Sequence, residues 1–303
     1  MDFSQLAEAQ LSTGGEWGPN ISTDLHMFRN APALHNLYLG DILLDCVPCP
    51  RNGIREFTSH SCPASECLDA LQAFPNLTSA HLRPFLVDDD DDDELPIVRH
   101  VQLRHLTVDE NGSDPDAWED DLESRPIHIL KYLALPALET MQISAMRVFE
   151  GAVIRAFLER SSPPLVKLTF KGYYLEIDSM VVLSSFKHLQ DLEFRYCSTK
   201  LVSQFGALLE QDKECLPKLK NFAVMADEWP RSERLPAVPP WAHQLGPALA
   251  HWNHSRLLSV RIVLQGQLID VEPEKMASVV RPFVFLKETG IKVYFGTKDT
   301  SIL

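Results

Sequence analysis

The first residues that could do chemistry are four cysteines in the N-terminal third of the chain. Cys46 and Cys49 form a C-x-x-C pair, Cys62 and Cys67 follow, and His60 precedes the second pair. Thiolates and an imidazole at such spacing are ligands that a tetrahedral zinc site uses. Cys67, however, falls on the apolar face of a predicted helix, where a buried thiol packs as a small hydrophobic side chain. We therefore expect loop and core cysteines, with a zinc site as the alternative.

Other catalytic and metal-binding patterns fail on their spacing. If Gly112 is aligned with the glycine of a calcium-binding loop, Thr107 and Trp118 occupy positions that require carboxylates. The sequence contains no nucleophile elbow, no phosphate-binding glycine loop and no H-E-x-x-H helix. The histidines near residue 250 share an amphipathic segment that supplies no carboxylate partner. We therefore expect a protein that is not an enzyme and that uses no cofactor and no metal.

The net charge of −14 over 303 residues is concentrated in one part of the chain. Residues 88–123 hold 15 acidic and two basic side chains, so this window carries −13 and the remainder of the chain −1. The six consecutive aspartates at 88–93 repel one another, which predicts a solvated loop, with a contact for a basic partner as the alternative. Phosphate binding needs a concentrated positive field, and no basic stripe is visible, so nucleic acid is not an expected partner.

The chain also lacks the usual signs of a membrane or secreted protein. No stretch approaches the ~18–20 apolar residues of a membrane span, and the N-terminus has no basic-then-apolar leader pattern. We therefore expect no membrane association, free thiols, and a cytoplasmic or nuclear location.

A short apolar pattern, L-x-x-L-x-L, recurs along the chain. The clearest copies read PALHNLYL, PALETMQI and PKLKNFAV. Successive copies start 20 to 38 residues apart, and a leucine-rich repeat takes about 20–29 residues, so the longer gaps hold insertions. The first apolar positions of the copies are Leu34, Ile54, Leu77, Leu103, Leu138, Leu165, Leu189, Leu219, Leu257 and Ile291.

The pattern dictates an architecture. Alternate side chains of a strand face opposite sides, so the second and third apolar positions of each copy point into a core together. Segments with a period near 3.6 lie between the copies, at 66–74, 148–160 and 201–210, and they predict helices. One repeat cannot close a core alone, so neighbouring repeats must stack. We predict an α/β fold, a curved leucine-rich-repeat solenoid with a parallel β-sheet on the concave face and helices on the convex face.

The side chains between the apolar strand positions are predicted to project from the concave face, which such repeat proteins offer as an extended binding surface. This row is polar and mixed in charge, and the alternative is a solvated face with no ligand. The loop aromatics Trp118, Trp229 and Trp241 are further candidate anchors at its rims. The candidate partner-binding residues are Tyr38, His81, His105, Thr107, Gln142, Lys167, Thr169, Asp191, Glu193 and Arg261.

Four segments together resemble the leucine-rich-repeat region of fungal F-box-like proteins. They read FRNAPALHNLYLGDI at 28–42, ASECLDALQAFPNLTSAHL at 64–82, LALPALETMQI at 133–143 and AFLERSSPPLVKLTF at 156–170. The resemblance extends over about residues 20–262 and rests on the order of these segments. It implies the substrate-recognition region of an F-box ubiquitin-ligase receptor. The helical F-box motif itself is not found, and residues 1–30 offer only a short amphipathic start.

The expected organisation is an N-terminal segment or cap at 1–30, the leucine-rich-repeat solenoid at 31–296 with acidic inserts at 88–94 and 109–123, and a C-terminal tail at 297–303. The expected function is a protein-interaction solenoid that binds a protein partner. An adaptor of a cullin ligase joins it only if an F-box lies outside this chain. The alternative is a free-standing leucine-rich-repeat protein with no ligase connection.

Overall fold

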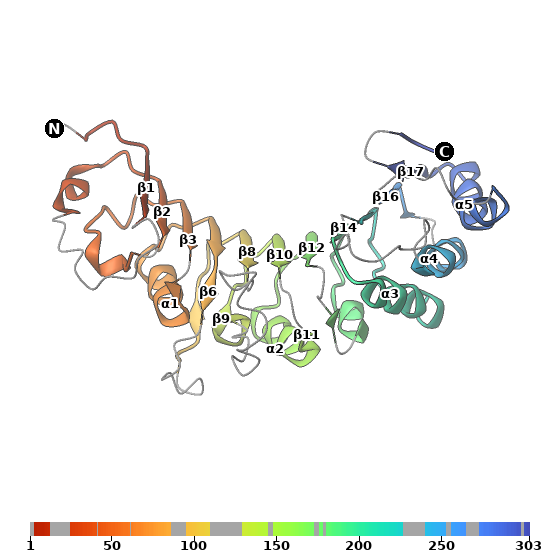
Figure 1. Ribbon diagram of the computed structural model, residues 1–303. Coiled ribbons are helices and arrows are strands. Elements are labelled where there is room, and N and C mark those ends of the chain that lie inside the picture. Colours follow the sequence, from red (N-terminus) through yellow and green to blue (C-terminus); the bar gives the residue numbers. More distant parts are fainter. Residues whose placement is uncertain are drawn as a thin grey trace, which may run out of the picture. The chain divides into compact units, whose positions relative to one another are not determined.

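The protein consists of two compact units, each built on a parallel β-sheet (Figure 1). Unit 1 comprises Met1–Ser144 and Ala156–Pro164, and unit 2 comprises Ala145–Arg155 and Leu165–Leu303. The computed structural model describes residues 3–12, 25–40, 42–60, 62–85, 95–109, 129–144, 148–172, 176–177, 180–226, 240–252, 256–264, 273–297 and 300–303.

The sheet of unit 1 contains one strand from each of six successive segments. They are β1 (Glu8–Ser12), β2 (Asn36–Gly40), β3 (Glu56–His60), β5 (Ser79–Leu82), β8 (His105–Asp109) and β10 (Thr140–Ser144). Each strand pairs in parallel with the next along the chain. Strand β1 lies within the segment predicted as a cap. It was not expected, because residues 8–12 contain no copy of the leucine pattern. The boundaries predicted at residues 30 and 296 stay predictions.

The leucine pattern produces this sheet in the predicted way. The first apolar residue of each repeat, such as Leu77 or Leu103, is fully buried where the chain turns into the strand. The residue after it donates its backbone N–H to the preceding repeat: Thr78 to Arg55 O at 2.8 Å and Arg104 to Thr78 O at 2.9 Å. Each repeat is thus held to its neighbour both by core packing and by backbone hydrogen bonds.

Short elements connect the strands of unit 1. Helix α1 (Ala64–Ala73) buries Cys67, Leu68 and Leu71, which confirms the apolar face predicted for 66–74. The other connections are η1 (Leu25–Asn30), η2 (Leu44–Cys46), η4 (Ile129–Tyr132) and two small strand pairs, β4 (Cys62–Pro63) with β6 (Pro84–Phe85) and β7 (Val98–Arg99) with β9 (Leu133–Ala134).

The sheet of unit 2 has the same parallel construction. Its strands are β12 (Lys167–Lys171), β14 (Asp191–Arg195), β15 (Asn221–Met225), β16 (Ser259–Leu264) and β17 (Lys292–Thr297). Strand β17 confirms the alternating element predicted at Ile291–Phe295. Other elements of this part are η5 (Met180–Ser185) and the paired strands β11 (Val148–Phe149) and β13 (Glu176–Ile177).

Longer helices connect the strands of unit 2. Helix α3 (Thr199–Gln211) confirms the helix predicted at 201–210, and α4 (Pro240–His251) and α5 (Pro273–Glu288) follow it. Helix α2 (Gly151–Ser161), predicted at 148–160, begins in residues of unit 2 and ends in residues of unit 1. In Figure 1 the helices α3, α4 and α5 lie on one side of the strands of unit 2, and α1 lies on one side of the strands of unit 1.

Phenylalanine rings fill the space between sheet and helix in unit 2. Phe194 on β14 is fully buried, with its ring centroid 5.8 Å from that of Phe170, 5.3 Å from that of Phe205 and 5.9 Å from that of Phe222. Phe205 comes from α3, so this cluster attaches the helix to three strands. The α/β class, the parallel sheet and the helices on one face are as predicted. The curvature implied by a leucine-rich-repeat solenoid stays a prediction.

Candidate functional site

One face of each sheet is the candidate site. Because side chains alternate along a strand, the buried residues of β2, Leu37 and Leu39, point toward the core, and Asn36 and Tyr38 point to the opposite side. In each unit we call this opposite side the helix-free face, since none of the described helices lies on it (Figure 1). The polar residues predicted to bind a partner belong to this face.

In unit 1 the strand register brings the predicted residues into rows. The central row contains Gln10, Tyr38, Thr58, His81, Thr107 and Gln142, each paired with the next across neighbouring strands. Its members are half-buried or exposed. In the adjacent row His105 is exposed, and its Nδ1 lies 2.8 Å from Oγ1 of Thr140 on the next strand. The row also contains Thr58, from a weaker copy of the pattern, and Gln10, from β1, neither of which was among the predicted residues.

In unit 2 the register again forms two rows. The first row contains Lys167, Asp191, Asn221, Ser259 and Lys292, and the second contains Thr169, Glu193, Ala223, Arg261 and Tyr294. Lys167 and Arg261 are exposed, and Asp191 and Glu193 are half-buried. Tyr294 was not among the predicted residues, although the alternation of residues 291–295 places it on the same side as Lys292.

Thr169 corrects one of the predicted site residues. Its exposed fraction is 3%, so it offers almost no surface to a partner. Threonine is short, and on this face it stands between Lys167 and Lys171 along its own strand and beside Glu193 across the register. These longer side chains limit its access to solvent.

Hydrogen bonds and one ion pair order the polar residues of unit 2. Ser259 donates to Asn221 Oδ1 at 2.7 Å, and Asn221 Nδ2 donates to Asp191 Oδ1 at 2.5 Å. Arg195 Nε lies 2.8 Å from Glu193 Oε1, and its terminal nitrogen donates to Oε2 at 2.9 Å. The hydrogen bond with Glu193 raises the pKa of the Arg195 guanidinium. These contacts hold the polar side chains of this part of the face in place.

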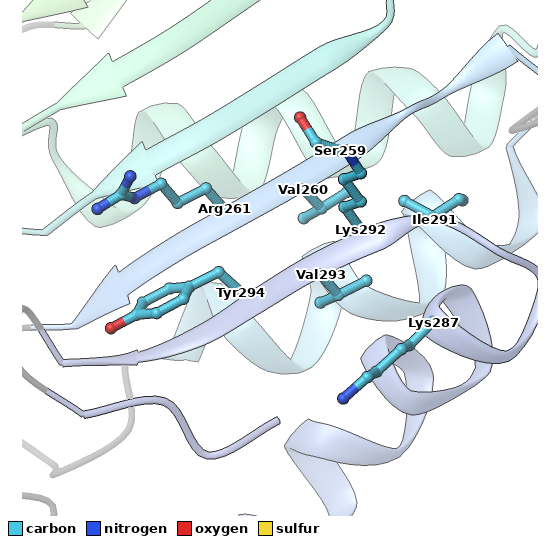
Figure 2. A pocket seen from close by; sticks show the side chains of 8 residues that line it. All are labelled: Ser259, Val260, Arg261, Lys287, Ile291, Lys292, Val293 and Tyr294. Carbon is cyan, nitrogen blue, oxygen red and sulfur yellow. The ribbon is translucent and has the colours of Figure 1, made fainter.

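An open hollow of about 600 Å³ lies at the β17 end of this sheet (Figure 2). Its lining comes from β16, from β17 with the residue before it, and from the last turn of α5. The guanidinium carbon of Arg261 lies 5.3 Å from the ring centroid of Tyr294, a cation–π contact. The Tyr294 hydroxyl donates to Thr297 O at 2.5 Å, which fixes the ring. The lining residues are Ser259, Val260, Arg261, Lys287, Ile291, Lys292, Val293 and Tyr294.

Within the described residues no group of three or more His, Cys, Asp or Glu side chains is placed to hold a metal ion, including the cysteines considered for zinc. Cys62 precedes α1 and Cys67 lies in its first turns, and both are buried, with their Sγ atoms 2.9 Å apart. Cys67 also lies 3.5 Å from Ser59 Oγ. The hydrogen bond with Cys62 and burial hold the pKa of the Cys67 thiol well above its ordinary value, so it stays protonated. The pair packs at the start of the helix as a hydrophobic staple.

The other sequence-level candidates are distributed as follows. Trp241, a candidate anchor at a rim, is only 2% exposed within α4, so it serves the core. Trp118, Trp229, the acidic insert 88–94 and the insert 109–123 beyond Asp109 lie outside the described residues. No helix in the described part of the chain is long and apolar enough to span a membrane.

Comparison with known proteins finds likenesses among solved structures. No protein-family model matches the chain, and no curated protein matches it. Among solved structures, an internalin from Listeria monocytogenes is similar, with 16% sequence identity and a TM-score of 0.33 over 91% of this chain. The chain spans 65% of the length of that internalin. At this identity and TM-score the likeness says nothing about function, which we argue from the geometry above.

Proposed function

We propose that this protein binds a protein partner through the helix-free faces of its two sheets. The observation that carries the proposal is the register, which places the polar residues of successive strands in continuous rows. A row such as Tyr38, His81, Thr107 and Gln142 presents hydrogen-bond donors and acceptors over several strands. A partner that spans several strands could contact such an area, as stable protein interfaces require.

The charge distribution supports a protein partner. On unit 2, the rows carry charges of both signs, with Lys167 beside Asp191 and with Glu193 and Arg261 in the second row. Mixed charges give orientation and selectivity to a protein–protein contact, whereas nucleic acid would require a positive field. Tyr38, Tyr294 and Arg261 are of the types that dominate interface energies.

The finer proposal follows from the resemblance to fungal F-box-like proteins. In that form the protein is the substrate-recognition region of a ubiquitin-ligase receptor, located in the cytoplasm or nucleus, and an F-box outside this chain binds the adaptor. The alternative is a free-standing leucine-rich-repeat protein. The intact mass of the protein purified from its own cells separates the two. A mass above 34.2 kDa with adaptor and cullin attached supports the receptor, and a mass of 34.2 kDa with neither supports the alternative.

Charge reversal on the helix-free face tests the binding proposal itself. His105→Glu and Lys167→Glu change one exposed strand position in each unit. Lys131→Glu and Lys213→Glu form the matched control, because both lysines are exposed but lie outside the strands. Proteins that co-purify with each form are quantified by mass spectrometry. We expect the partner to be lost from the first pair and retained by the control, with unchanged thermal transitions. Equal recovery of the partner from both pairs contradicts the proposal.

A further inference from the structure

The hollow beside β17 carries an unbalanced positive charge. Three of its lining residues, Arg261, Lys287 and Lys292, are basic, and none is acidic. Among the described residues these three side chains form no ion pair. Glu288 follows Lys287 at the end of α5 and is exposed, and the described lining together with Glu288 stays net positive.

Two other cations at the strands have acidic partners, whereas the exposed Lys167 forms no ion pair within the described part of the chain. Arg195 pairs with Glu193 at 2.8 Å in unit 2. Arg104, at the start of a strand in unit 1, pairs with Glu139 at 3.0 Å. In a chain with a net charge of −14, three exposed cations that form no ion pair with any described residue lie around one hollow. Such a cluster attracts an anionic ligand.

The shape and lining of the hollow indicate what kind of anion fits. Sites for small anions enclose the ligand and hold their charged groups in place. Here Arg261, Lys287 and Lys292 are all exposed, and the hollow is open to solvent. Figure 2 shows Lys287 on the α5 side and Arg261 with Tyr294 on the strands, so the cations are spread over different elements. An open, spread arrangement suits an extended chain with several carboxylates.

Apolar groups separate these cations. Val293 and the Tyr294 ring, both half-buried, line the hollow together with Val260 and Ile291, which are buried and offer little surface. In an extended peptide, alternate side chains point to opposite sides. Carboxylates at every second position can reach the cations, and the aliphatic side chains between them can contact Val293 and the Tyr294 ring.

We propose that this hollow binds an extended acidic segment of a protein partner, with acidic and apolar residues in alternation. The inference rests on the proposed protein-binding function and names the chemistry of one contact. Arg261 and Lys292 face the segment from the strands, and Lys287 faces it from α5. The cation–π contact with Tyr294 positions the Arg261 guanidinium for a carboxylate.

Fluorescence anisotropy with a short labelled peptide of alternating glutamate and valine tests the inference. We expect this peptide to bind the wild-type protein and to bind less tightly as salt is added. Lys287→Glu with Lys292→Glu should weaken binding by about tenfold or more. Lys187→Glu with Lys213→Glu adds the same negative charge elsewhere in unit 2, at exposed positions outside the strands, and this control should keep the wild-type affinity.

A peptide of alternating lysine and valine keeps the test independent of folding defects. It should bind the Lys287→Glu, Lys292→Glu protein more tightly than the wild type, because the charges are exchanged.

The inference is overturned if the glutamate peptide fails to bind the wild type at low salt, or binds both double variants equally. It is also overturned if citrate competes as well as the peptide at equal carboxylate concentration, which would indicate a small-anion site. If the partner still depends on His105 and Lys167, failure here removes the hollow and leaves the proposed function intact.

Discussion

Replacing Phe194 by alanine should destabilise unit 2 more than any change at its surface. Phe194 is fully buried, and its ring contacts those of Phe170, Phe205 and Phe222 at centroid distances between 5.3 and 5.9 Å. Burial of a phenylalanine side chain contributes roughly 1.5–3 kcal/mol, and each aromatic pair adds roughly 0.5–1.5 kcal/mol. The three pairs share one ring and are not additive. With the cavity that remains, we expect Phe194→Ala to lower the free energy of unfolding by about 4 kcal/mol.

Urea denaturation measures this loss. Trp241 and Trp252 are 2% and 3% exposed in unit 2, so their fluorescence changes when that unit unfolds. Phe194→Leu retains most of the apolar volume but loses the ring contacts, and it should cost about 1.5 kcal/mol. Phe285→Ala is the matched control, because Phe285 is 47% exposed on α5, and it should cost less than about 1 kcal/mol. If Phe194→Ala and Phe285→Ala have equal effects, the ring cluster does not hold α3 to the sheet and the reasoning is refuted.

Three further changes test other parts of the structure. Ser198 is the N-cap of α3, and its Oγ accepts a hydrogen bond from Leu201 N–H at 3.1 Å. Ser198→Ala should lower the free energy of unfolding in urea by about 1 kcal/mol, whereas Ser198→Asp should keep most of the stability. Burial raises the pKa of the Cys197 thiol from 9.0 to about 12, so between these pH values the folded state retains a proton that the unfolded state loses. The free energy of unfolding should therefore fall as the pH rises from 9 to 12. An equal fall in Cys197→Ala would show that this thiol is not responsible. Leu168→Asp places a charge at a fully buried position of β12 and should abolish the cooperative thermal transition; an unchanged transition would contradict the repeat register.

The sequence predicted the strands well because their pattern is physically restrictive. A one-residue slip in L-x-x-L-x-L would turn every buried side chain to the solvent, so the register of Leu168 with Leu192 and of Leu192 with Phe222 follows from the pattern alone. The same restriction located the polar rows. Lys167 and Glu193 occupy row positions because they stand between apolar residues that must be buried.

Other features depend on information that the pattern does not carry. Helix α5 was not expected, because Pro282 interrupts its sequence and proline removes a backbone donor within a helix. Strand β1 has only Ala9 and Leu11 as apolar residues and is stabilised mainly by pairing with β2. The burial of Thr169 depends on the lengths of neighbouring side chains across the sheet, which periodicity does not include. The hollow was missed because it combines α5 with two strands, and only the three-dimensional arrangement brings Arg261 to the same hollow as Lys287 and Lys292.

Site-specific photocrosslinking tests most directly whether the helix-free faces bind a protein. Benzoylphenylalanine replaces Tyr38 in unit 1 or Tyr294 in unit 2, both half-buried aromatic positions of the central rows. Phe285 on α5, exposed and aromatic but outside the sheets, serves as the matched control position. After irradiation in the protein's own cells, we expect a covalent adduct with a partner chain from the Tyr38 and Tyr294 positions and none from the Phe285 position. Adducts from the Phe285 position alone would contradict the claim that these faces bind the partner.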